Sequence, residues 1–153
     1  MRIKKRQIVV GSLLCVLLVI LIIGWTLFPS YSEVLRANWG FSLPGQARCA
    51  EVYEKDSGDS FHGDGIRYHV FSYRDRDPVD GMLAWSETEK KTIFDGSYQK
   101  AATKWLDKIG VPEEQRPDYA GCAFWYKAQE DNSEILVFRN QAENRLYIVE
   151  SIL

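Results

Sequence analysis

The residues best suited to chemistry gather in one short stretch, where aspartates and a histidine are interleaved with glycine: Asp56, Asp59, His62 and Asp64. Carboxylates in a glycine-rich loop can bind Ca²⁺, and a histidine beside an aspartate can act as a general base. The spacing does not match an EF-hand loop. Tight turns favour the same glycines and aspartates. The pattern therefore favours a turn, with a ligand or metal site as the alternative.

The other sequence patterns of catalysis are absent from the chain. It contains no GxSxG or SxxK motif and no glycine loop that opens a helix to hold phosphate. There are only two histidines. His69 alternates with Arg67 and Phe71 along a predicted strand, which indicates a structural role in a sheet. These patterns argue against an enzyme, and no cofactor is predicted.

An uncharged, mostly apolar segment spans residues 8–28. As a helix it would be about 31 Å long, which matches the hydrocarbon core of a bilayer. A cleavable signal peptide is the alternative, but its apolar region usually runs only about 7–15 residues. We therefore expect a retained transmembrane helix.

Basic residues precede this segment at positions 2, 4, 5 and 6, whereas the residues just after it carry no positive charge. The positive-inside rule then places the N-terminus in the cytoplasm. The expected organisation is a single-pass cell-membrane protein with a cytoplasmic N-terminus at 1–7, a transmembrane helix at 8–28, a juxtamembrane segment at 29–46 and an extracytoplasmic domain at 47–153.

The overall net charge of −2 conceals an uneven distribution. Residues 29–153 keep 15 of the 19 basic side chains and all 21 acidic ones, which gives them a net charge of −6. This excess of negative charge argues against a nucleic-acid partner.

Cys49 and Cys122 lie in the part expected outside the cytoplasm, where a disulfide is permitted. Two buried free thiols are the alternative, because cysteine is often buried in cores. The sequence leaves both open. Cys15 is read as one more apolar residue of the segment 8–28.

Alternating and amphipathic patterns predict the elements that must position these residues. Ser30 and Glu33 form a capping-box pattern before a short helix over 31–38, which Gly40 ends. An amphipathic helix is expected over 97–109. Strands are expected over 47–55, 65–73, 121–128, 134–139 and 145–151, and residues 82–85 could add a short one.

The predicted fold class is α+β: an N-terminal transmembrane helix followed by an antiparallel β-sheet domain in the order β-β-α-β-β-β, with one helix packed on a face. If the other face is uncovered, an aromatic contact patch is expected there from Trp125, Tyr147, Phe71 and Tyr73. The alternative, a second core layer formed by residues 79–95, is favoured.

The basic start, the single apolar span and the strings "SFHGDG" (60–65) and "RLYIVES" (145–151) resemble small membrane-anchored proteins of Gram-positive bacteria. That resemblance implies the layout of the chain and no activity. Topology, acidity and abundant aromatic residues favour a non-enzymatic, membrane-tethered binding domain with a protein or envelope partner. A small ligand- or metal-binding enzyme with its site at 56–69 is the alternative, and an immunity or inhibitor protein is a third.

Overall fold

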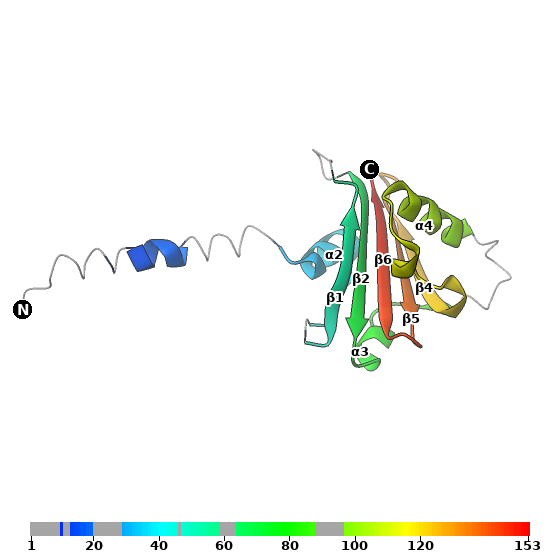
Figure 1. Ribbon diagram of the computed structural model, residues 1–153, viewed down its shortest axis with the longest axis horizontal. Helices are drawn as coiled ribbons and strands as arrows, with labels where there is room; N and C mark the ends of the chain where they lie inside the picture. The colour runs from blue at the N-terminus through cyan, green and yellow to red at the C-terminus, as the bar shows by residue number, and fades with distance from the viewer. Residues whose placement is uncertain (1–9, 11–12, 20–28, 46, 59–63, 88–96) are drawn as a thin grey trace, which may run out of the picture. The chain divides into compact units, whose positions relative to one another are not determined.

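The computed structural model describes residues 10, 13–19, 29–45, 47–58, 64–87 and 97–153 (Figure 1). The chain divides into two compact units, residues 1–40 and 41–153. Within the described residues, no helix combines the length and the apolar character that a membrane crossing requires.

The first unit contains helix α2, Tyr31–Trp39. Both the backbone N–H and the hydroxyl of Ser30 donate to Oε2 of Glu33, at 2.8 and 2.9 Å. These hydrogen bonds hold the pKa of Glu33 below its usual value. Gly40 ends the helix with a left-handed φ of 86°, a conformation that glycine adopts without strain. The predicted helix and both of its end signals are confirmed.

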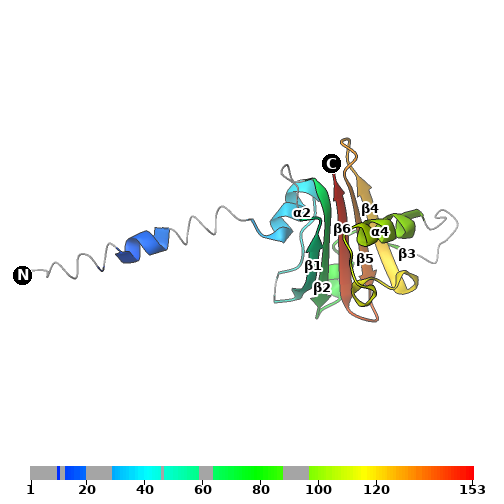
Figure 2. The same ribbon diagram turned by 45° about the horizontal axis from the view of Figure 1, so that its top comes forward.

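The second unit is built on one antiparallel sheet with the strand order β1-β2-β6-β5-β4-β3 (Figures 1 and 2). The strands are β1 (Cys49–Asp56), β2 (Gly65–Tyr73), β3 (Ser86–Glu87), β4 (Cys122–Ala128), β5 (Glu134–Asn140) and β6 (Arg145–Ile152). Strands β1 and β2 form an antiparallel hairpin, and β4, β5 and β6 form an antiparallel meander, as predicted. The C-terminal strand β6 joins the two groups, because it pairs with both β2 and β5.

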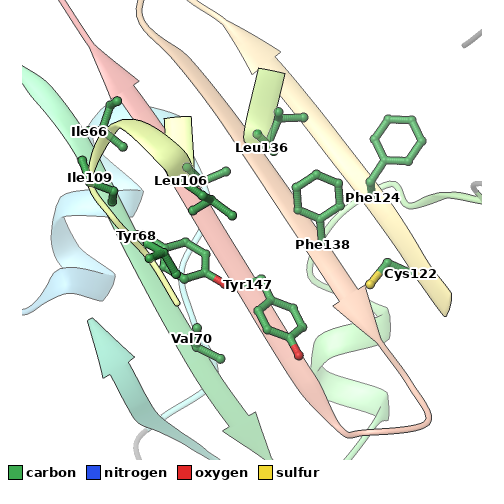
Figure 3. Close-up of a cluster of buried hydrophobic side chains, with 13 residues drawn as sticks. Ile66, Tyr68, Val70, Leu106, Ile109, Cys122, Phe124, Leu136, Phe138 and Tyr147 are labelled. Atoms are coloured by element: carbon green, nitrogen blue, oxygen red, sulfur yellow. The ribbon is translucent and has the colours of Figure 1, made fainter. Parts of the chain in front are cut away.

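Helix α4, Ser97–Lys108, lies across one face of this sheet (Figure 2). Its residues Ala102 and Leu106 are fully buried, and Ile109 just beyond its end is nearly so. They pack in one cluster with side chains from the strands, among them Tyr68 and Phe138 (Figure 3). The amphipathic pattern of residues 97–109 thus predicted both the helix and its buried face.

The opposite face of the sheet is also covered. Its central residues are buried, although α4 lies on the other side: Ile135, Val137, Leu146 and Ile148. Phe41 meets Trp125 edge-on at 5.4 Å between ring centroids. The Arg139 guanidinium lies 4.8 Å from the ring of Trp85 and pairs with Asp80. The sheet is therefore packed on both faces.

The predicted fold class is wrong in two respects. The transmembrane helix expected over 8–28 is not found, because the described residues hold no helix suited to that role, and 8–9, 11–12 and 20–28 lie outside them. The order β-β-α-β-β-β also omits two elements between β2 and α4, the helix α3 (Asp77–Asp80) and the strand β3. The antiparallel sheet with a helix across one face is present.

Physical reasons account for the two missed elements. Proline often breaks regular structure, but it also suits the first turn of a helix, where Pro78 stands in α3. Strand β3 has only two residues and is held by its pairing with Phe124 and Ala123. The short strand suggested at 82–85 is instead a turn in which the Trp85 indole donates to the carbonyl of Val79 at 3.0 Å.

Candidate functional site

A β-bulge in β1 brings three ionisable side chains together on one face of the sheet. Glu51 pairs with Phe71 and Glu54 with His69, and the register shifts between Glu51 and Tyr53. In a regular strand, residues three apart point to opposite faces. The bulge adds one extra residue between Glu51 and Glu54, so the two side chains point to the same face. Glu51 and Glu54 therefore share the face of the sheet that carries His69.

These three residues form the Glu51–Glu54–His69 cluster. The His69 ring donates from Nδ1 to Oε1 of Glu51 over 2.5 Å. One ligand atom from each of the three side chains lies within 4.8 Å of the others. The His69 side chain is only 13% exposed, against 37% for Glu51, so the imidazole is held in place while the carboxylates face solvent.

The neighbouring Phe71 ring helps to hold the imidazole. It lies on the same face two positions along β2, with ring centroids 6.3 Å apart and planes inclined by 17°. Phe71 is itself buried. The cluster thus has one rigid ligand, His69, and two adaptable ones, which is an arrangement suited to binding a cation.

A second row of charges crosses the same face one step along the strands. Arg67 of β2 stands between Asp56 of β1 and Glu150 of β6 in the strand register. Glu150 is fully buried. A buried carboxylate is costly unless it is paired and hydrogen-bonded, so we interpret Arg67 as the charge that balances Glu150.

The loop residues singled out from the sequence are only partly placed. Asp59 and His62 lie outside the described residues, and Asp64 is exposed just before β2. Asp56 accepts a hydrogen bond from the backbone N–H of Gly58 at 3.0 Å. This is the turn-forming role that the sequence favoured for the stretch.

The two cysteines of the second unit are buried free thiols, the alternative to a disulfide. Cys49 is on β1 and Cys122 on β4, separated by three strands. At the usual strand spacing this places them about 19 Å apart across the sheet, too far for a disulfide. Burial raises the pKa of Cys49 to about 11 and that of Cys122 to about 12. Both are therefore protonated and poor nucleophiles at neutral pH.

The aromatic contact patch is not present as an exposed surface. Phe71, Tyr73 and Tyr147 are all buried. Tyr147 belongs to the core under α4 and so lies on the face opposite Trp125, which meets Phe41. The strand alternation of Trp125 with its neighbours was predicted correctly, but the register of β6 relative to β4 was not available from the sequence.

Two further polar side chains, Arg116 and Tyr126, serve structural roles. Arg116 donates from Nε and Nη2 to the carbonyl of Val111 and from Nη1 to Asp107 at 2.6 Å, which ties the end of α4 to the segment after it. The hydroxyl of Tyr126 donates to Glu134 at 2.5 Å, and this hydrogen bond contributes most to raising its pKa to about 12. Each joins neighbouring elements of the same unit.

Sequence reasoning missed Glu51 and Glu54 and interpreted His69 as structural. The three residues share one face because of the register shift in β1, and this shift can be seen only once β1 is paired with β2. Comparison with known proteins adds nothing to the cluster, because no family model, curated protein or solved structure matches the chain. Its chemistry is therefore argued from the residues themselves.

Proposed function

We propose that this protein is a non-catalytic binding domain, held at a membrane through residues 8–28 and exposed on the extracytoplasmic side. It binds a partner protein that presents positive charge, and the binding surface is the Glu51–Glu54–His69 cluster with the exposed residues of β1 around it. The observation that carries the proposal is the convergence of two carboxylates and one imidazole on the edge strand β1 and its neighbour β2.

The distribution of burial supports this surface. Strand β1 ends the sheet order, and Cys49 is its only buried residue. By contrast, β5 and β6 are mostly buried along their whole length. Among the described residues of the second unit, Val52 at the bulge is one of two exposed large hydrophobic residues, at 51%.

Charge supports the nature of the partner. Residues 29–153 carry a net charge of −6, and Glu51 and Glu54 both lie in the exposed part of β1. A complementary positive surface would be steered toward this edge and held in register there. A bulge and charged side chains discourage the addition of another strand, so we expect the partner to bind the side chains and not the backbone edge.

Membrane attachment and orientation rest on the sequence. Residues 8–28 carry no charge, and the basic residues stand only on their N-terminal side. That asymmetry favours a cytoplasmic N-terminus.

The pKa of both buried thiols is raised, which supports a binding role over cysteine-based catalysis.

A single labelling experiment on intact cells tests both the surface and its location. In a Cys15→Ser background, Val52→Cys is labelled with a membrane-impermeant maleimide that carries a photoreactive benzophenone. We expect labelling from outside the cell and, after irradiation, one discrete adduct with a partner protein. The same adduct should be lost when Glu51→Gln and Glu54→Gln are added, because the charge that attracts the partner is removed.

Glu130→Cys, in the exposed turn between β4 and β5, is the matched control. It should be labelled as well as the Val52 position but should give no adduct. Labelling of both positions only after lysis would contradict the extracytoplasmic location. An adduct that forms equally from both positions, or that survives loss of the two carboxylates, would contradict the binding surface.

A further inference from the structure

We propose that Glu51, Glu54 and His69 bind a divalent first-row transition-metal ion, for which Zn²⁺ is the probe. The inference rests on the proposed function in that it uses the same surface, and it adds a ligand that regulates that surface. The structure supplies three protein ligands whose donor atoms already lie within 4.8 Å of one another.

The set of ligand atoms selects the class of metal. One imidazole nitrogen with two carboxylate oxygens suits Zn²⁺ and its first-row neighbours. Ca²⁺ takes six to eight oxygen ligands, and Mg²⁺ prefers oxygen ligands and keeps several waters. The presence of His69 among the ligands therefore favours a transition metal over either of these ions.

The geometry requires only small side-chain movements. Tetrahedral zinc with bonds of about 2.1 Å separates its ligand atoms by about 3.4 Å. His69 Nδ1 and Glu51 Oε1 are 2.5 Å apart, so this contact would open by about 1 Å as the ion replaces the shared proton. Glu51 is partly exposed and can move, while His69 is held beside Phe71.

Binding of the ion would regulate the partner. Its two positive charges would offset the two carboxylates, and the surface would lose the negative charge that attracts a basic partner. Zn²⁺ and the partner protein should therefore compete for the cluster.

Calorimetric titration of the untagged full-length chain in detergent with ZnCl₂, in the Cys15→Ser background, tests the inference. We expect one ion per chain. His69→Gln should weaken binding by at least about tenfold, as even the loss of a supporting contact around a metal often does. His62→Gln replaces the only other histidine and should leave the affinity unchanged.

A second pair of variants keeps the test independent of any folding defect in His69→Gln. Glu51→Gln with Glu54→Gln should abolish binding, whereas Glu114→Gln with Glu130→Gln removes two exposed carboxylates elsewhere and should not. Circular dichroism spectra should be alike for both double variants. The inference is overturned if no ion binds at one per chain, or if the two double variants bind equally.

The outcomes separate this inference from the proposed function. If Zn²⁺ does not bind but the Val52 adduct forms and needs the two glutamates, the metal inference alone fails. If Zn²⁺ binds and no adduct ever forms, the partner proposal alone fails. If both hold, Zn²⁺ should suppress the adduct formed by the Val52→Cys protein that keeps Glu51, Glu54 and His69, and an adduct unaffected by saturating Zn²⁺ would overturn the regulatory part.

Discussion

Replacing Arg67 by methionine is expected to lower the free energy of unfolding by about 3–5 kcal/mol, the usual cost of leaving a buried charge without its partner. Glu150 is fully buried, and Arg67 is its direct neighbour across β2 and β6. Methionine keeps much of the side-chain volume but removes the charge. Denaturant unfolding of the full chain in detergent, followed by tryptophan fluorescence, measures the change.

The control is the double variant Arg67→Met with Glu150→Leu. It removes both charged groups, so most of the lost stability should return, because apolar side chains can replace charged ones in a buried site at little cost. Typical single substitutions cost about 1 kcal/mol or less. A loss in this range for Arg67→Met would contradict this account of Glu150. So would a double variant that is no more stable than the single one.

Replacing Phe138 by alanine is expected to cost a similar amount, about 3–5 kcal/mol, through a cavity in the core under α4. Phe138 is 1% exposed in the middle of the sheet, and its ring meets Tyr119 edge-on at 5.0 Å. The same unfolding measurement applies. Phe138→Leu fills most of the space and should cost less.

Val52→Ala is the control for this second prediction. Val52 is 51% exposed at the bulge, and a substitution there should change stability by no more than about 0.5 kcal/mol. If Phe138→Ala were as mild as Val52→Ala, the assignment of the main core to the face beneath α4 would be wrong.

Much of the fold could be predicted because local patterns and tertiary packing agree. Strand 65–73 coincides with β2, and the helix expected over 97–109 differs from α4 by one residue. The aromatic and β-branched run in the first and the apolar stripe in the second describe the surfaces that they bury. The capping pattern at Ser30 and Glu33 is equally local.

The full order in which the strands pair could not be predicted from the sequence. The pairing of β6 with β2 joins segments about eighty positions apart in sequence, and no local pattern specifies it. This pairing decides that Tyr147 faces α4 and that Glu150 lies buried beside Arg67. The aromatic patch, the less favoured expectation for this face, is not exposed, because Phe71, Tyr73 and Tyr147 are all buried.

The candidate site shows the same limit more sharply. Glu51 and Glu54 are three residues apart, and a regular strand would have sent them to opposite faces. One register shift at Val52 reverses that conclusion. Residue types alone pointed to a site in the loop at Asp56. The Glu51–Glu54–His69 cluster instead depends on a bulge, whose position cannot be predicted from residue types.

The central claim is that the bulge in β1 assembles a binding site from Glu51, Glu54 and His69. The most direct measurement is an anomalous difference map, recorded above the zinc absorption edge, from crystals of the full chain grown with Zn²⁺. We predict one peak about 2.0–2.2 Å from a ring nitrogen of His69 and from a carboxylate oxygen of each glutamate. Zinc bound at His62 with no peak at His69 would contradict the account.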